Sequence, residues 1–305
     1  MDSQRIVIAG GSGFIGSALA REWSAAGQPV VVLTRSPRVR SDGVLELAWD
    51  GATVGPWAAQ LDGATAVVNL AGRSINCPHT PENLREIAAS RINSVKALAA
   101  AITRVPRAPR VWVQASAVGF YGDTRAVVAD ENASAGDDLL ANVCRQWEDA
   151  FGVAAAGTAR QVTLRIGVVL GRAGGALPML AGMTRCFLGG AAGNGRQYVS
   201  WIHLADLAAM FRAAVADENL AGVFNAVAPR PVTNGELMRE LRQVLHRPWS
   251  PPAPGWAVRL GARLMGTEGS LALVSQRCVP AKFLNAGFPF RFAELRLALK
   301  DLLGS

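Results

Sequence analysis

The sequence predicts an α/β fold built on a doubly wound parallel sheet. Short apolar strand patterns alternate with helical patterns over most of the chain, and a glycine-rich turn joins the first strand to the first helix. Strands of a parallel sheet are buried on both faces, which accounts for their near-continuous apolar runs. Because the chain of 305 residues exceeds the usual size of one simple domain, we also expect a smaller C-terminal domain on the substrate side.

The N-terminal residues form one βαβ unit. Residues 5–9 are a β-branched strand pattern, residues 10–16 are a glycine-rich turn, and residues 17–26 have an alanine-rich helical pattern that ends at Gly27. Residues 29–33 then predict the second strand. Strand, turn, helix and strand in this order are the context that a nucleotide-binding turn requires.

Further units extend the predicted sheet. Strand patterns follow at residues 66–70, 110–115 and 162–170, with helical crossovers at residues 81–103 and 138–155. The pattern then loosens into a glycine-rich stretch (171–195), a strand pattern (198–202) and a helical pattern (204–215). Loose, glycine-rich sequence is typical of substrate-facing loops.

A linker separates the two expected domains. Four prolines cluster between residues 248 and 254, and a mixed helical pattern follows toward the C-terminus. We therefore expect a domain boundary near Ser250, which divides the chain into residues 1–250 and residues 251–305.

The glycine-rich turn has the spacing of a dinucleotide-binding site. Gly10, Gly13 and Gly16 stand three residues apart. The first permits the tight turn, the second lets the backbone approach a pyrophosphate, and the third lets the helix pack on the strand. Phe14 and Ile15 lie between them, where the dipole of the following helix faces the phosphates. Turn and context together predict a Rossmann-type fold that binds a dinucleotide.

The end of the second strand predicts which dinucleotide is bound. An NAD enzyme presents an acidic residue here to the ribose 2′-hydroxyl, whereas this chain has Thr34-Arg35-Ser36. Arg35 offers a planar donor fork to a 2′-phosphate, with Thr34 and Ser36 as hydroxyl donors and Arg38 as a second cation. We therefore expect NADP(H); the alternative explanation of Arg35 is a solvated surface arginine.

Several motifs resemble those of a known family. Gly10-Gly-Ser-Gly-Phe-Ile-Gly16 is similar to the nucleotide-binding turn of extended short-chain dehydrogenases/reductases, which include sugar-nucleotide epimerases. Almost the whole chain resembles an atypical, epimerase-like branch of the NAD-dependent epimerase/dehydratase type, which carries a small C-terminal domain of unknown function. The other segments that carry the likeness are Val68-Asn-Leu-Ala-Gly72, Ser90-Arg-Ile-Asn93, Ser116-Ala-Val-Gly-Phe-Tyr-Gly122, Trp201-Ile-His-Leu-Ala-Asp206 and Asn225-Ala-Val-Ala-Pro229.

The resemblance implies further cofactor contacts. Backbone contacts are implied for Leu70, Ala71 and Gly72, side-chain contacts for Glu86 and Arg91, and a place beside the nicotinamide for Val169. For Glu86 and Arg91 the alternative is a surface ion pair on a helix. For Val169 the alternative is plain core packing.

The catalytic residues depart from the family pattern. Ser116 matches the family's active-site hydroxyl at the carboxyl edge of the sheet, although a serine there is also a good turn residue. The family's YxxxK pair is missing, because the matching positions run from Leu140 to Cys144 and neither tyrosine of the chain has a lysine four residues on. A tyrosine with its free pKa of about 10 is a poor base at neutral pH. The candidate substitutes are Tyr121, Cys144 and His203.

The expected function is that of an NADP(H)-dependent oxidoreductase or epimerase-like enzyme. Its substrate would be a small molecule, such as a nucleotide sugar or a carbonyl compound, with Arg165, Arg196 and Trp201 as candidate contacts. The alternative is a protein that binds NADP(H) without turnover and reports redox state to a partner. The missing tyrosine and lysine favour that alternative.

Composition argues against several other classes. The formal charge is +8, but the arginines are scattered rather than gathered with aromatic residues, so we expect no nucleic-acid partner. The cysteines and histidines lack the spacings of a disulfide scaffold or a metal site. Apolar runs are far shorter than a spanning helix needs, and no signal-peptide pattern is present. We therefore expect a cytoplasmic protein without a membrane partner.

Overall fold

Within residues 5–155 and 160–304, which the computed structural model describes, seven parallel strands form the central sheet. Their bounds are β1 Ile6–Ala9, β2 Val30–Thr34, β3 Leu45–Ala48, β4 Ala66–Asn69, β5 Val111–Ala117, β6 Arg160–Ile166 and β11 Gly222–Ala226. The order across the sheet is β11-β6-β5-β4-β1-β2-β3, so the direction of winding reverses between β1 and β4. Ligands of doubly wound sheets bind at such a reversal, at the carboxyl ends of the strands. The predicted doubly wound parallel sheet is confirmed.

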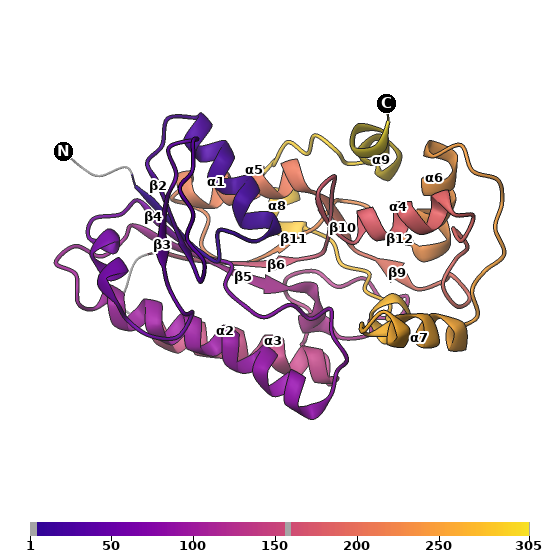
Figure 1. Cartoon of the computed structure of the whole chain (residues 1–305), viewed down its shortest axis with the longest axis horizontal. Helices are drawn as coiled ribbons and strands as arrows, with labels where there is room; N and C mark the ends of the chain where they lie inside the picture. The colour runs from indigo at the N-terminus through magenta and orange to yellow at the C-terminus, as the bar shows by residue number, and fades with distance from the viewer. Residues whose placement is uncertain (1–4, 156–159, 305) are drawn as a thin grey trace.

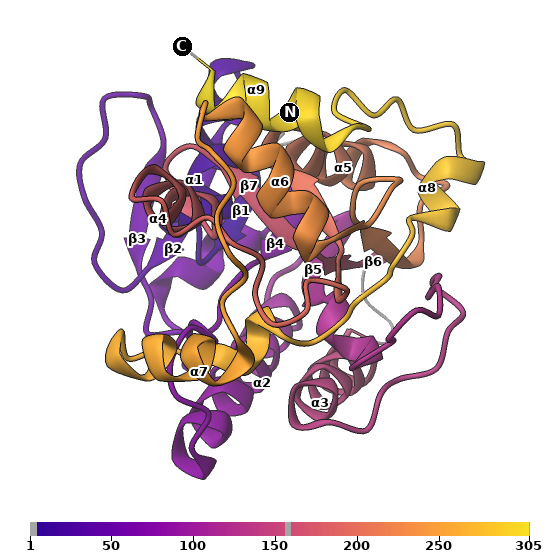
Figure 2. The same ribbon diagram turned by 90° about the vertical axis from the view of Figure 1, so that its right-hand side faces the viewer.

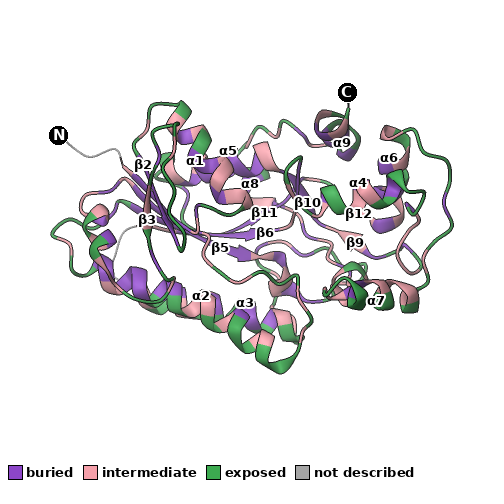
Figure 3. Cartoon of the chain, viewed as in Figure 1, coloured by how far each residue is buried: buried purple, intermediate pink, exposed green. Residues whose placement is uncertain are grey.

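Helices cover both faces of this sheet. Figure 1 shows α1 (Phe14–Ala25) and α5 (Leu204–Ala216) on one face, and α2 (Pro81–Ile102) and α3 (Leu139–Ala154) on the other. The inner strands between these helices are buried, as the centre of Figure 3 shows. Burial on both faces explains why the inner strands read as continuous apolar runs in the sequence.

The strand predicted at residues 162–170 is two strands in different sheets. β6 ends before Gly167, and β7 (Val168–Gly171) pairs with β10 (Trp201–His203) in a small sheet. A Cβ at Gly167 would lie 2.4 Å from the carbonyl oxygen of Ser200. The chain leaves the main sheet at this glycine because another backbone approaches it closely.

Shorter elements complete the fold. They are β8 Gly174–Gly175, β9 Tyr198–Val199, β12 Val232–Thr233, α4 Leu177–Arg185, α6 Asn234–Val244, α7 Gly255–Leu264, α8 Ala281–Asn285, α9 Leu295–Leu303, and the 3₁₀ turns η1 Pro56–Leu61, η2 Val118–Tyr121 and η3 Gly269–Ala272. β9 and β10 divide the single strand predicted at residues 198–202. β3, β11, α4 and α6 lie outside the predicted elements.

A small C-terminal domain packs against the carboxyl edge of the sheet. α9 lies beside α6, while α7 lies on the opposite side of the same end, as Figures 1 and 2 show. Residues 275–279, here called the return segment, run between residues 124–129 and residues 198–200. The Thr124 N–H donates to the Ser275 carbonyl at 2.8 Å. On the other side, the Gln276 N–H donates to the Tyr198 carbonyl of β9 at 2.9 Å, and the Ser200 hydroxyl bonds to the backbone of residues 276 and 278. The C-terminal domain is thereby tied to the chain that follows β5.

Candidate active site

The glycines of the turn after β1 differ in what surrounds them. Gly10 has a φ of +76°, and a Cβ there would lie 2.9 Å from the backbone nitrogen of Ala71. A Cβ at Gly16 would lie 2.6 Å from the Cα of Gly11. A Cβ at Gly13 would meet the carbonyl oxygen of Gly10 at 3.4 Å, which is ordinary packing. Gly10 and Gly16 therefore pack against protein, whereas Gly13 borders space that a ligand can fill.

The first turn of α1 borders the same space. The N–H groups of Phe14, Ile15 and Gly16 open the helix and so lack helical acceptors. The capping residue Gly13 has no side chain to accept from them, and the helix dipole adds partial positive charge. This arrangement fits the pyrophosphate of a dinucleotide.

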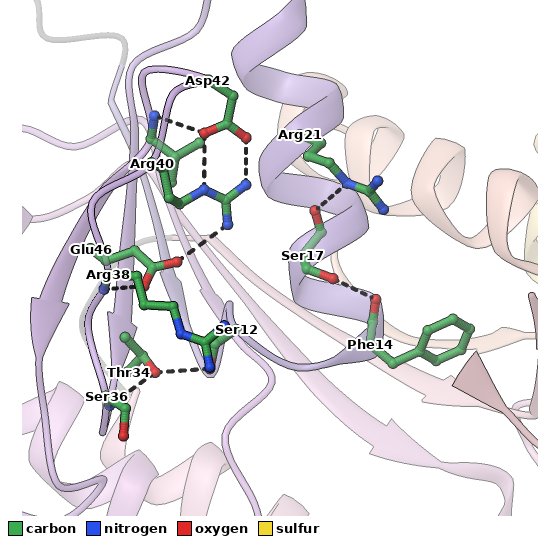
Figure 4. A network of polar contacts seen from close by, with 11 residues as sticks. Ser12, Phe14, Ser17, Arg21, Thr34, Ser36, Arg38, Arg40, Asp42 and Glu46 are labelled. Carbon is green, nitrogen blue, oxygen red and sulfur yellow. Dashed lines mark hydrogen bonds and ion pairs between the residues drawn. The ribbon is translucent and has the colours of Figure 1, made fainter. Parts of the chain in front are cut away.

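The Phe14 ring turns away from that space. A Cβ at Gly174 would lie 2.4 Å from the ring and one at Gly171 would lie 2.6 Å from it, so the ring rests on the β7–β8 hairpin. Figure 4 shows the ring pointing away from Ser12. Val169, in the same hairpin, is 8% exposed and belongs to the main core. Phe14 thus offers its backbone to the site and uses its ring to join the turn to the hairpin.

Arginines gather beyond the end of β2. Thr34 Oγ1 lies 2.8 Å from Ser12 Oγ, which joins the strand end to the glycine turn (Figure 4). Arg35 is exposed, and among the residues described it has no hydrogen-bond or ion-pair partner. Figure 4 shows the Arg38 side chain extended in the direction of Ser12 and Thr34. The structure therefore brings the predicted phosphate-binding residues together.

The two carboxylates near this loop are already engaged. Arg40 pairs with Asp42 and Glu46, and its guanidinium holds the pKa of the Asp42 carboxyl at about 2. Glu46 also accepts the backbone N–H of Arg38 at 2.9 Å. The side chains of Arg35 and Arg38 thus remain available to an anion. Sequence reasoning missed Arg40 and Glu46 because it did not predict β3, which carries Glu46.

Asn69 shapes the loop that follows β4. Its Oδ1 accepts the Ala71 N–H at 3.0 Å, while its Nδ2 donates to side chains of α2 and β5. Asn69 is fully buried, so these bonds fix the backbone of Leu70 and Ala71 against Gly10. Its place as the second residue of the Val68-Asn-Leu-Ala-Gly72 motif was a signal for this role.

Arg91 and Glu86, the two candidate cofactor contacts on α2, lie in different surroundings. Arg91 lies against the loop, since a Cβ at Gly72 would be 3.2 Å from Arg91 Cγ. Its Nη1 donates to the carbonyl oxygens of Arg73 and Ile87, and burial lowers its pKa. Glu86 is exposed and pairs with Arg73. The fold thus places Arg91 against the loop that follows β4 and Glu86 at the surface.

A buried polar network lies at the carboxyl end of β5. Ser116 Oγ donates to Glu148 Oε1 of α3 at 2.5 Å. Arg165, which stands opposite Ser116 in the register of β5 and β6, donates to the same carboxylate from Nε (2.9 Å) and Nη2 (2.8 Å). Its Nη1 donates to the Tyr121 hydroxyl at 2.9 Å, and that hydroxyl donates to Asn225 Oδ1 at 2.8 Å. Sequence reasoning missed Glu148 and the role of Asn225.

This network makes Tyr121 a poor base. Burial raises the pKa of Tyr121 to about 12, and the hydroxyl proton is already donated to Asn225. Ser116 differs, because its oxygen keeps lone pairs with which to accept a further hydrogen bond. The network therefore places a serine hydroxyl at the sheet edge with a carboxylate behind it.

Two expected substrate contacts are internal residues. The Arg165 guanidinium donates hydrogen bonds to Glu148 and Tyr121. Its Cζ atom lies 3.4 Å from the centroid of the Phe120 ring. Trp201 is buried, and its indole N–H donates to the Arg230 carbonyl at 3.0 Å. Both side chains are buried and already engaged within the protein, so the structure gives these two expectations no support.

Cys144 and His203, the other candidate substitutes for the missing tyrosine and lysine, are also buried in the protein. Burial raises the pKa of the Cys144 thiol to about 12. His203 Nδ1 accepts the Ala205 N–H at 3.0 Å, and its ring stacks on Phe292 with centroids 3.9 Å apart. Burial also lowers the pKa of His203. Cys144 thus packs in the interior, whereas His203 caps α5 and places its Nε2 3.3 Å from Asp301 Oδ2.

A cavity of about 520 Å³ opens beside the chain that follows β5. Its walls come from the chain after β5, from residues 193–198, from α7 and from the start of the return segment. Arg125, Arg196 and Arg259 line it, together with Asp123, which accepts the backbone N–H groups of Arg125 and Ser275. The lining is therefore cationic and suits a small molecule with phosphate or carboxylate groups.

Metal ligands do not gather in the described part of the chain: no group of three or more His, Cys, Asp or Glu side chains there could hold a metal ion. Over the same residues, no helix combines the length and the apolar character needed to cross a bilayer. All four cysteines are free thiols.

Comparisons with known sequences cover nearly the whole chain. Residues 6–226 match the NAD dependent epimerase/dehydratase family, and residues 253–302 match a domain of unknown function, DUF1731. The chain is similar to an Arabidopsis thaliana protein named "Epimerase family protein SDR39U1 homolog, chloroplastic". The two are 36% identical over 308 residues, which covers 99% of this chain and 88% of that protein.

Solved structures show the same likeness. The crystal structure of human epimerase family protein SDR39U1 (isoform2) with NADPH has a TM-score of 0.85 and 34% identity, and the match covers 98% of each chain. The structure of MoeE5 in complex with UDP-glucose and NAD has a TM-score of 0.77 over 97% of this chain and 96% of that one. At 20% identity the second likeness is one of fold alone.

Proposed function

The chain belongs to the NAD-dependent epimerase/dehydratase family, and from this premise we propose that it is an NADP(H)-dependent, epimerase-like oxidoreductase that acts on an anionic small molecule. The observation that carries the proposal is one sheet edge that presents the α1 turn, the arginines after β2 and Ser116. NADPH in the human relative's structure supports the choice of cofactor. When bound, NADP(H) supplies or accepts a hydride. The cytoplasm is the proposed compartment.

The proposed cofactor contacts follow this edge. Backbone N–H groups at the start of α1 hold the pyrophosphate, and residues after β2 hold the 2′-phosphate. The loop after β4 supplies backbone along the cofactor. The complete proposed set is Gly10, Gly13, Phe14, Ile15, Gly16, Thr34, Arg35, Leu70, Ala71, Gly72, Glu86, Arg91 and Val169.

Ser116 is the proposed proton-handling residue. Its Oγ can accept a hydrogen bond from a substrate hydroxyl while its own proton passes to Glu148 Oε1 along the 2.5 Å bond. Arg165 holds that carboxylate in place from the other side. Tyr121 supports the same arrangement through Arg165, rather than by exchanging a proton itself.

The arginine-lined cavity supports the substrate class. Arg125, Arg196 and Arg259 come from three separate segments and converge on one space. Arginine forks bind phosphate and carboxylate oxygens in bidentate fashion. A nucleotide sugar fits this chemistry, and MoeE5, which shares the fold, has been solved in complex with UDP-glucose. A carbonyl compound with an anionic group is the other class that fits.

Arg35→Asp is expected to reverse the cofactor preference. A charge-assisted fork from Arg35 to the 2′-phosphate contributes roughly 1.5–3 kcal/mol, which is about a tenfold to hundredfold preference for NADPH over NADH. The new carboxylate would repel the phosphate and accept a hydrogen bond from an unmodified ribose hydroxyl. Calorimetry with both nucleotides, at low and high salt, measures the change. Arg104→Asp, another exposed arginine just after α2, is the control, and an unchanged ratio in Arg35→Asp would place the phosphate elsewhere.

A second candidate function is an NADP(H)-binding redox sensor without turnover. The engagement of Tyr121, Cys144 and His203 inside the protein favours it.

A screen that follows NADPH absorbance with nucleotide sugars and carbonyl compounds separates the two functions. We expect turnover, which Ser116→Ala lowers by about 10²- to 10⁴-fold, the usual contribution of general acid–base catalysis. NADPH affinity in that variant should stay at the parental value. Tight NADPH binding without turnover of any compound would select the sensor.

A further inference from the structure

One helix of the C-terminal domain presents an apolar row to solvent. α7 buries Ala262, whereas Trp256 is 68% exposed, Leu264 is 80% exposed, and Leu260 lies between them one turn from each. Residues four apart share one face of a helix. Figure 3 shows α7 at the surface, largely exposed or intermediate. Exposed rows of large apolar side chains are a recognised mark of an interaction surface.

Positive charge flanks this row without negative charge in the same stretch. Residues 241–267 contain four arginines and no aspartate or glutamate. Two of them, Arg259 and Arg263, are exposed on α7 beside the apolar row. Two carboxylates border the stretch. Glu240 pairs with Arg239 and Arg296, and Glu268 accepts the backbone N–H groups of Ser270 and His79.

A second cluster of exposed apolar side chains beside an arginine lies at the N-terminal end of the linker. Trp249 is 74% exposed, and Phe187 and Leu188 are exposed near the linker. The Arg247 guanidinium lies over the Phe187 ring at 5.2 Å. The segment that ends in Phe187 and Leu188 is also free of carboxylates, since residues 150–205 contain no aspartate or glutamate.

We propose that α7 and the linker before it dock on an anionic phospholipid surface. Tryptophan and leucine on an amphipathic helix insert at the boundary of headgroups and acyl chains, and neighbouring arginines attract acidic headgroups. The net charge of +8 acts in the same direction. This surface contact needs no spanning helix, so it differs from the sequence-based expectation of no membrane partner, which rested on the lack of a spanning segment.

A second copy of the chain fits this face less well. Two copies that met through α7 would bring Arg259 and Arg263 of each into apposition, with no carboxylate of residues 241–267 to pair with them. Like charges at an interface oppose association. The acid-free composition thus favours an anionic partner.

The test is sedimentation of the full-length protein with vesicles of phosphatidylcholine alone, and with vesicles in which about a third of the lipid is phosphatidylglycerol. We expect binding to the second kind only, and weaker binding at high salt because salt screens the arginines. The double variant Trp256→Ala, Leu260→Ala should bind about tenfold more weakly or worse, since it loses the inserted apolar area. Arg263→Gln should weaken binding and reduce its salt dependence.

Leu297→Ala is the matched control, because Leu297 is also exposed on a short helix but lies on α9. It should bind as the parent does, and all variants should keep the parental affinity for NADPH. Failure of the parent to bind acidic vesicles would overturn the proposal, as would an equal loss in Leu297→Ala. A parental dimer in sedimentation velocity that the α7 variants dissociate would also overturn it, in favour of a self-association surface.

Discussion

Gly13→Val is expected to abolish NADPH binding in a protein that stays folded. The backbone at Gly13 has φ of −74°, which any residue adopts, and a Cβ there meets the protein at an ordinary 3.4 Å. The valine side chain would instead fill the space before the N–H groups that open α1. Loss of these charge-assisted bonds should lower the affinity by about a hundredfold or more. Calorimetry gives the affinity, and circular dichroism gives the fold.

Gly16→Val serves as the contrasting variant. A Cβ at Gly16 would lie 2.6 Å from the Cα of Gly11, and neither backbone can move easily. We expect this variant to lose stability by about 1–3 kcal/mol or more through overpacking. A folded Gly13→Val protein that bound NADPH as tightly as the parent would show that the pyrophosphate lies elsewhere.

Arg165→Met is expected to cause the largest loss of stability among single changes in the site. The side chains of Arg165 and Glu148 are 6% and 13% exposed, so water has little access to this ion pair. Removal of the guanidinium leaves the Glu148 carboxylate buried without its partner and takes a donor from Tyr121. Breaking a buried pair from one side costs about 3–5 kcal/mol. Urea unfolding at neutral pH measures the change.

The double variant Arg165→Met, Glu148→Met tests the cause. Replacing both partners removes the stranded charge, so the double variant should be more stable than Arg165→Met alone. Adding the single variant Glu148→Met completes a double-mutant cycle, and that cycle gives the coupling energy between the two side chains. Additive losses would mean that the two side chains contribute independently, contrary to the geometry.

The cofactor side of the fold was predictable because its signals are local. One βαβ unit contains the Gly10–Gly16 spacing, the strand before it and the Arg35 position. Within such a unit, neighbours in sequence are neighbours in space. The edge strand β3 was missed because it is half-exposed and has no continuous apolar run. The division of the chain at Ser250 stays a prediction.

The proposed catalytic network was less predictable because it joins distant segments. Ser116, Glu148 and Arg165 meet only after β5 and β6 pair in register and α3 packs beside them. Two signals were nevertheless present in the sequence. Arg165 interrupts an apolar strand, and a buried charge requires a partner. Glu148 stands one helical turn after Cys144, on the face where the family pair would lie.

The return segment sets an order of events as the chain is made. Its hydrogen bonds to residues 124–125 join positions about 150 residues apart in sequence. A nascent chain can form the first βαβ unit early, because those contacts are local. The wall of the arginine-lined cavity must wait until residues 275–279 have emerged from the ribosome and docked. The glycine turn after β1 is therefore synthesised long before the segment that completes the wall of the arginine-lined cavity.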